Sequence, residues 1–178
     1  RLGLCYLENV DNHWVHFAAC DSGALINLTR YQATLASEDF DIIVWGKTGY
    51  FNAIKAPTMY GWVHEVDGLI SRIGVKKAPE FPENTPIVLG TFAFRNKSIF
   101  LSCYDSMLKR EGLVNDEYYI DEMINDAVDL GLKCKLFEVD HYICWGTPID
   151  LETFNYWQSC FNKWASHPYE ISRDYLTR

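Results

Sequence analysis

The chain has 178 residues, of which 48% are hydrophobic and 15% aromatic, and its formal net charge is −8. This length fits a single domain over residues 1–178, and this composition supplies a packed core, which excludes a disordered chain. The negative charge argues against a nucleic-acid-binding protein, because such binding needs a surplus of Lys and Arg. An anionic small substrate would need a divalent cation or a few well-placed cationic side chains beside it.

The N-terminal residues carry acidic and polar groups where a signal peptide needs an apolar stretch, and no run of 18 or more apolar residues occurs. We therefore expect a soluble, cytoplasmic protein with no membrane partner. The six cysteines include no Cys-x-x-Cys pair, which favours free thiols over a zinc or redox motif. His13 and His16 would fall on opposite faces of a strand, which argues against a metal site there.

The first part of the chain predicts a strand, a helix and a second strand. Residues 13–19 (HWVHFAA) and 41–45 (DIIVW) have the pattern of buried strands, and residues 28–36 that of a short helix. This order predicts an α/β layer with a parallel sheet and with ligands at the carboxyl ends of its strands.

The next part predicts a hairpin and a further strand. Residues 61–77 (GWVHEVDGLISRIGVKK) alternate around Asp67-Gly68, a dipeptide that suits the positive φ angles of a tight hairpin turn. Residues 78–86 are rich in proline and predict a loop. Residues 87–94 (IVLGTFAF) then predict a strand that contains Gly90.

The last part predicts helices. Residues 117–131 place their apolar side chains at helical spacing and end at Gly131. A final helix is expected to start at Thr147 as N-cap, with Pro148 in its first position and Asp150 three residues after the cap. Its apolar stripe, which we expect to pack in the core, comprises Leu151, Phe154, Trp157, Phe161 and Trp164.

Asp21 follows the first predicted strand directly and precedes Ser22-Gly23. A carboxylate at such a strand end suits Mg²⁺, which proteins hold with one or two carboxylates. The alternative is an Asp that caps the following turn. The local sequence leaves both interpretations open.

Two further groups have residue types that suit a sugar phosphate. Tyr60-Gly61 and Gly90 indicate close approach of a ligand, and Lys76-Lys77 would meet a phosphate; the alternatives are a strand bulge and solvated lysines. Glu117 and Tyr119 would bind sugar hydroxyls, and the alternative is a helix-start carboxylate beside core tyrosines.

The order of these segments resembles the sugar-1-phosphate nucleotidyltransferase family, which includes glucose-1-phosphate thymidylyltransferases and other NDP-sugar pyrophosphorylases. The resemblance covers nearly the whole chain, and CWGTPIDLETFNYWQ is its most specific part. The segments that carry it are CDSG at 20–23, NAI and MYGWV within 52–63, VKKAP at 75–79, LGTFAF at 89–94, DEYYIDEMIN at 116–125 and CWGTPIDLETFNYWQ at 144–158.

The resemblance implies a Rossmann-like mixed sheet of the nucleotide-diphospho-sugar transferase type, present in part, with a β-hairpin excursion. It implies a reaction between a nucleoside triphosphate and a sugar 1-phosphate, with Mg²⁺ as cofactor. Asp21 would bind the metal and Lys77 the sugar phosphate. The residues that would border or contact the sugar are Tyr60, Gly61, Gly90, Glu117 and Tyr119.

The chain departs from the family pattern in two ways. Cys144 stands where many relatives have a second metal-binding Asp, and thiolate is a poor Mg²⁺ ligand; Asp140, four residues earlier on the same strand face, is the candidate replacement. No glycine-rich nucleotide-binding loop precedes Asp21. We therefore expect the chain to supply only the sugar and metal half, to be inactive alone, and to form a homo-oligomer that covers exposed sheet surface.

The principal alternative is a non-catalytic domain of the same fold that binds a sugar phosphate or has a regulatory role. The missing glycine-rich loop favours this alternative. A glycosyltransferase with a similar sheet and a metal-binding Asp is a third interpretation, which the CWGTPIDL segment fits poorly.

Overall fold

The structure is a computed structural model that describes residues 12–163 and 170–173. The chain divides into two compact units. The first comprises residues 1–20 and 24–142, and the second comprises residues 21–23 and 143–178. Cys5 and Trp164, which the sequence analysis considered, lie outside the described residues.

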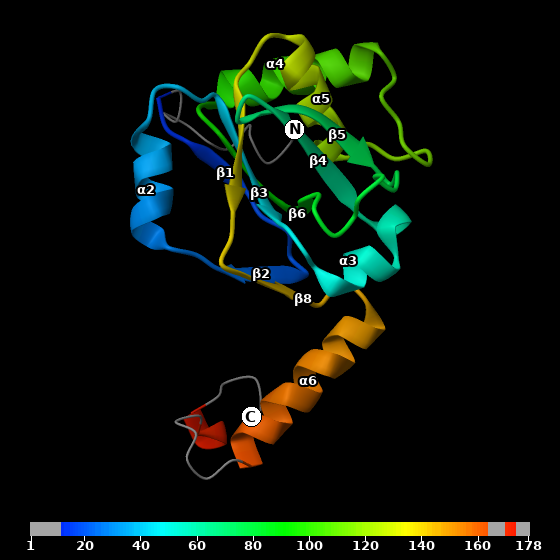
Figure 1. Cartoon of the computed structure of the whole chain (residues 1–178). Helices are drawn as coiled ribbons and strands as arrows, with labels where there is room; N and C mark the ends of the chain where they lie inside the picture. Colours follow the sequence, from blue (N-terminus) through cyan, green and yellow to red (C-terminus); the bar gives the residue numbers. More distant parts are fainter. Residues whose placement is uncertain (1–11, 164–169, 174–178) are drawn as a thin grey trace. The chain divides into compact units, whose positions relative to one another are not determined.

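The first unit contains a six-stranded mixed sheet (Figure 1). The central strand β6 has β4 and β1 on one side and β3 on the other, and β5 and β7 lie at the two ends. The strands are β1 (Val15–Phe17), β3 (Ile42–Lys47), β4 (Gly61–Val66), β5 (Leu69–Val75), β6 (Ile87–Phe94) and β7 (Cys134–Glu138).

The predicted α/β class with a mixed sheet is confirmed, but the expectation of a parallel sheet is wrong. The pair β3 and β7 is parallel, whereas β1, β3 and β4 all run antiparallel to β6. Val15 and Ile42 both have Phe94 as their register partner, so β6 separates the first two predicted strands. A strand that comes much later in the chain inserts between them, which local sequence does not reveal.

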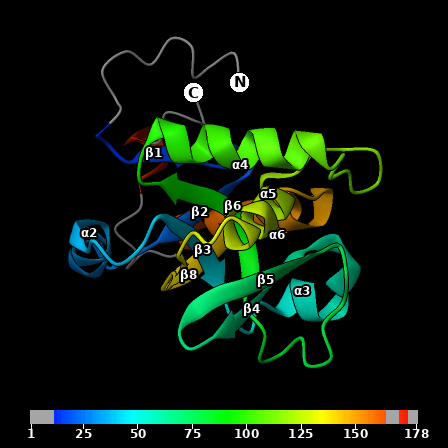
Figure 2. The same cartoon turned by 90° about the horizontal axis from the view of Figure 1, so that it is seen from above.

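Helices cover both faces of the sheet because successive side chains of a strand point to opposite sides. Ile42 and Val44 of β3 pack with α4 (Lys97–Lys109) and α5 (Ile120–Asp129), which lie together in Figure 2. Ile43 faces the other way. It belongs to the cluster that includes residues of α2 (Leu28–Ala36) and α3 (Phe51–Lys55).

Helix α5 also satisfies the backbone of the edge strand β5. The side-chain amide of the buried Asn125 donates to the Ile73 carbonyl at 3.0 Å and accepts from the Ile73 N–H at 2.7 Å. The next residue, Asp126, accepts hydrogen bonds from Arg110 and Ser106. These polar contacts join α5 to both β5 and α4.

The predicted hairpin is confirmed as β4 and β5. Asp67 and Gly68 have φ angles of 52° and 75°, as a tight turn with two positive φ angles requires. The short helix η1 (Pro57–Met59) follows α3 and leads directly into β4. The segment of Tyr60 and Gly61 therefore lies at the base of the hairpin, away from its turn.

The second unit contains α6 (Pro148–Lys163) and η2 (Ile171–Arg173). The predicted N-cap of α6 is confirmed. The Thr147 hydroxyl accepts from the Asp150 N–H at 3.2 Å and donates to the Asp150 carboxylate at 2.8 Å. The expected core packing of the α6 stripe is wrong for Trp157, Leu151 and Phe161, which are 54%, 46% and 39% exposed.

The chain passes between the units in two strands, β2 (Ser22–Leu25) and β8 (His141–Cys144), which pair with each other in a separate two-stranded sheet. None of the helices in the described part of the chain is long and apolar enough to cross a membrane.

Candidate functional site

Lys76 is the residue that organises the base of the hairpin. Its φ angle of 55° turns the chain at the end of β5, and its N–H donates to the Tyr60 carbonyl at 3.0 Å. Its ammonium group donates to the Met59 carbonyl at 2.5 Å. Lys76 therefore holds the segment that leads into Gly61.

The N-terminal end of α5 lies beside this base. The Lys76 ammonium group is 5.8 Å from the centre of the Tyr119 ring, and Tyr119 is the N-cap residue of α5. The Tyr119 hydroxyl donates a hydrogen bond to the exposed carboxylate of Glu117, and this bond raises the pKa of Tyr119. Lys76 thus links the Tyr60 backbone to Tyr119 and, through Tyr119, to Glu117, residues that the sequence analysis had singled out separately.

Asp121 is a member of this cluster that the sequence analysis missed. A Cβ atom added to Gly61 would lie 2.5 Å from Asp121 Oδ2, so the carboxyl group occupies the space that a side chain would fill. Desolvation raises the pKa of Asp121 to about 6, and the Lys76 ammonium group opposes this shift. An acidic residue in the first helical turn was the available signal, but its approach to Gly61 depends on tertiary packing.

Lys77 differs from its neighbour Lys76 in the surroundings of its ammonium group. Its side chain is exposed and makes no hydrogen bond or ion pair with any residue that the structure describes. Directly after the organised Lys76, it presents a cation at the same end of the hairpin. An ammonium group of this kind can donate to a phosphate, and contact between Lys77 and a sugar phosphate stays a prediction.

Gly90 lies in a bulge of β6. The register between β3 and β6 shifts between Val44 and Gly46, and Gly90 has a φ angle of 72°. An added Cβ atom would lie 3.1 Å from the Ala19 side chain. These contacts support the bulge interpretation and a close backbone approach, while contact between Gly90 and a sugar stays a prediction.

Asp21 lies in the second unit, next to the residues that precede α6. Its carbonyl accepts from the Trp145 N–H at 2.8 Å, and Oδ2 lies 2.9 Å from the position of a Cβ atom on Gly146. The Cys144 thiol lies 3.6 Å from that same position and accepts a hydrogen bond from the Gly146 N–H. The exposed Asp21 carboxylate has no hydrogen bond or ion pair with other described residues.

Asp140 lies in the first unit, in the turn between β7 and β8. The expectation that it shares a strand face with Cys144 is wrong, because β8 begins at His141. Its carboxylate forms an ion pair with Arg30 at 3.1 Å. A metal ion at Asp140 would have to compete with this guanidinium group.

The residues around Asp21 fit Mg²⁺ poorly. Magnesium prefers hard oxygen ligands in a near-octahedral arrangement, and here one carboxylate has a thiol as its neighbour. Among the described residues, no group of three or more His, Cys, Asp or Glu side chains is arranged to hold a metal ion.

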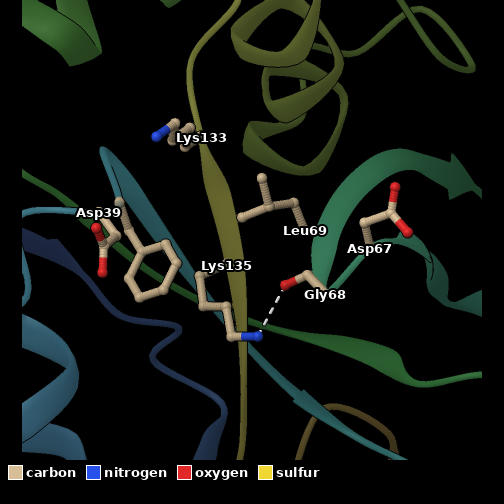
Figure 3. A pocket seen from close by; sticks show the side chains of 7 residues that line it. Asp39, Asp67, Gly68, Leu69, Lys133 and Lys135 are labelled. Atoms are coloured by element: carbon tan, nitrogen blue, oxygen red, sulfur yellow. Dashed lines mark hydrogen bonds between the residues drawn. The ribbon is translucent and has the colours of Figure 1, made fainter.

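A hollow of about 380 Å³ lies at the other end of the hairpin, beside its Asp67-Gly68 turn. Figure 3 shows Lys135 of β7 reaching toward this turn, where its ammonium group donates to the Gly68 carbonyl at 2.8 Å. Lys133, Asp39 and Asp67 also line the hollow, so its charges are mixed. None of the predicted site residues lines it.

No protein-family model and no curated protein sequence matches the chain. Solved structures do match: a Bacillus anthracis protein assigned as a glucose-1-phosphate thymidylyltransferase, in complex with sucrose, superposes with a TM-score of 0.63 at 18% identity. The fold resembles that of nucleotidyltransferases. This match covers 88% of the chain and 58% of the solved structure.

Two further nucleotidyltransferase-type structures are similar. A nucleoside-diphosphate-sugar pyrophosphorylase of Vibrio cholerae RC9 has a TM-score of 0.62 at 15% identity, over 86% of this chain and 59% of the other. The inositol-1-phosphate CTP transferase of T. maritima has a TM-score of 0.61 at 17% identity, over 91% and 60%. The chain thus spans less than two thirds of the length of each structure, and the likeness concerns the fold.

Proposed function

We propose that the chain is the sugar-binding and metal-binding part of a nucleotidyltransferase that makes an NDP-sugar and pyrophosphate from a nucleoside triphosphate and a sugar 1-phosphate. The observation that carries this proposal is the group formed by Lys76, the Tyr60 backbone, Glu117 and Tyr119, which the exposed Lys77 follows directly in the chain. The likeness of the fold to three such enzymes supports it.

The cluster has the donors and acceptors that a sugar phosphate requires. The Glu117 carboxylate accepts hydrogen bonds from sugar hydroxyls, and the Tyr119 hydroxyl donates or accepts. Gly61 is buried, and the Asp121 carboxyl group fills the space beside it, so Gly61 acts through the backbone shape of the hairpin base. Lys77 supplies a charge-assisted hydrogen bond to the phosphate.

In the proposed reaction, an oxygen of the sugar phosphate attacks the α-phosphorus of the nucleotide. A new P–O bond forms, the bond from the α-phosphorus to the bridging oxygen breaks, and pyrophosphate leaves with that electron pair. Lys77 holds the attacking phosphate in line and neutralises its charge, which is mainly a positioning role. The family resemblance assigns a divalent cation to Asp21, but the described residues around Asp21 fit Mg²⁺ poorly, so the role of Asp21 is tested by substitution.

A non-catalytic sugar-phosphate-binding domain is the second candidate. Two observations favour it, namely the thiol of Cys144 beside Asp21 and the ion pair between Asp140 and Arg30. This candidate predicts that sugar phosphates bind in the same cluster without turnover.

Turnover by the complete protein that carries this chain separates the two candidates. We expect Asp21→Asn to lower the rate of pyrophosphate release by orders of magnitude while the protein stays folded. Asp39→Asn, which removes another exposed carboxylate, is the matched control and should leave the rate unchanged. A rate that is equally normal in both variants would remove Asp21 from the reaction, and absence of turnover in the wild type would favour the binding domain.

A further inference from the structure

The chain makes a tight turn at residues 114–117, between α4 and α5. The two central residues of this turn, Asn115 and Asp116, have φ angles of 50° and 63°. The Val114 N–H donates to the Glu117 carbonyl at 2.9 Å, and the Glu117 N–H donates to the Val114 carbonyl at 3.1 Å. These features match a two-residue turn in which both central residues need a positive φ angle.

Packing of the two central residues does not explain their conformation. Asn115 and Asp116 are exposed, and their side chains make no hydrogen bond or ion pair with other residues that the structure describes. A positive φ angle costs free energy in residues other than glycine, although Asn and Asp tolerate it better than most. An unfavourable conformation that serves no packing leads to a hypothesis of function.

The turn determines where the Glu117 carboxylate lies. Val114 before the turn and Tyr119 after it both pack against the buried core cluster of the first unit. Between these two residues the chain reverses, and Glu117 Oε2 accepts a hydrogen bond from the Tyr119 hydroxyl. This hydrogen bond raises the pKa of Tyr119. Oε1, the other carboxylate oxygen, makes no hydrogen bond with a described residue and stays available to a ligand.

We propose that Asn115 and Asp116 are positioning residues that act through Glu117, and that their turn directs the Glu117 carboxylate toward the hydroxyl groups of a sugar phosphate. An acceptor that is fixed before the ligand arrives lowers the cost of ordering the site on binding. The inference rests on the proposed function, because it takes the ligand to be a sugar phosphate. The placement of Glu117 by the turn can be measured without any ligand.

Three substitutions of Asp116 separate the effect of backbone conformation from that of charge, since each of them removes the carboxylate. Glycine and asparagine tolerate a positive φ angle, whereas the β-branched valine does not. In calorimetric titration with glucose 1-phosphate, Asp116→Gly and Asp116→Asn should bind as the wild type does. Asp116→Val should bind at least about tenfold more weakly, because the carboxylate is misplaced. Asn115→Val is a second variant with the same expected loss.

The ionisation of Tyr119, followed by NMR of isotope-labelled tyrosine, reports the turn in the absence of ligand. Loss of the hydrogen bond to Glu117 should lower the pKa of Tyr119 in Asp116→Val toward its ordinary value of 10.0. Asp116→Gly should keep the raised pKa. In the background of Glu117→Ala, Asp116→Val should weaken glucose 1-phosphate binding no further, because the two residues act through one contact.

A Tyr119 pKa that stays raised in both folded valine variants overturns the placement of Glu117 by the turn. Wild-type affinity for glucose 1-phosphate beside a lowered Tyr119 pKa overturns the role of the turn toward the sugar, and so does a further loss of affinity in the double variant. If the wild type binds no sugar 1-phosphate, the proposed function fails, whereas the titration of Tyr119 still decides whether the turn positions Glu117.

Discussion

Asp121 makes the stability of the first unit depend on pH. Its pKa in the folded protein, about 6, exceeds the ordinary value of 3.8 because of desolvation. The folded state therefore binds the proton more tightly than the unfolded state. The resulting stabilisation is fully present below about pH 4 and is lost as the pH rises through 6.

Comparison of the wild type with Asp121→Asn, which cannot titrate, measures this effect. Between pH 4 and pH 7 the unfolding free energy of the wild type should fall by about 1–3 kcal/mol relative to the variant, since one pKa unit corresponds to about 1.4 kcal/mol. Urea denaturation at the two pH values provides the measurement. A difference between the two proteins that does not change with pH would contradict the account of Asp121.

Gly61 and Asp121 should be energetically coupled. The Cβ atom in Gly61→Ala would lie 2.5 Å from the Asp121 carboxylate, so the variant should lose about 1–3 kcal/mol of stability. Truncation of the carboxylate in Asp121→Ala makes room for the added methyl group. The double variant should therefore be more stable than the sum of the single effects predicts, and strictly additive effects would show that the two residues do not touch.

Asn125 joins two elements, because it completes the hydrogen bonding of the edge strand β5 from helix α5. Asn125→Ala leaves the N–H and the carbonyl of Ile73 without these partners, and we expect a loss of about 2–4 kcal/mol. Asn155→Ala, at an exposed position of α6, is the matched control. Equal denaturation midpoints for the two variants would contradict this role.

The start of α6 depends on the Thr147 cap. Thr147→Ala should lower the stability of the helix by about 1 kcal/mol. It should also speed hydrogen exchange at the Asp150 amide, because the substitution removes the hydroxyl that accepts from this amide. Thr153→Ala removes a hydroxyl that bonds to the Ile149 carbonyl within the same helix and should leave that amide unaffected. Unchanged exchange at Asp150 in Thr147→Ala would show that the cap is dispensable.

Elements with local signals could be predicted from the sequence, whereas their pairing could not. Residues 28–36 and 87–94 have the predicted bounds, and at Asn27 the side chain accepts the Arg30 N–H as an N-cap does. The order of the strands depends on contacts between distant segments. For the same reason the exposure of the aromatic side chains of α6 did not follow from their spacing.

The residues of the candidate site likewise fall into those that the sequence predicted and those that only the structure revealed. Residue types and the family resemblance singled out Lys77, Glu117 and Tyr119, but the structure added how Lys76 organises the hairpin base. Asp121 was not predicted because its role depends on contact with Gly61. The fold places the Asp121 carboxyl group against this glycine, which has no side chain of its own. The assignment of each residue to a sugar or phosphate stays a prediction.

At the scale of the whole molecule, the chain has a nucleotidyltransferase-like fold but spans less than two thirds of the solved structures that it resembles. Synthesis of an NDP-sugar is therefore a proposal for the complete protein. The expected homo-oligomer likewise stays a prediction, and light scattering of the purified chain would measure its molecular mass.

Binding of sugar 1-phosphates to the chain tests the central claim most directly, because it needs neither the nucleotide nor turnover. Calorimetric titration with glucose 1-phosphate and other sugar 1-phosphates, beside the unphosphorylated sugars, should show binding that depends on the phosphate. Lys77→Ala should weaken this binding at least about tenfold, and more than Lys76→Ala does, because a charge-assisted hydrogen bond is lost. Lys55→Ala should bind as the wild type does. Small and equal effects of Lys76→Ala and Lys77→Ala, or no phosphate-dependent binding by the wild type, would contradict the account.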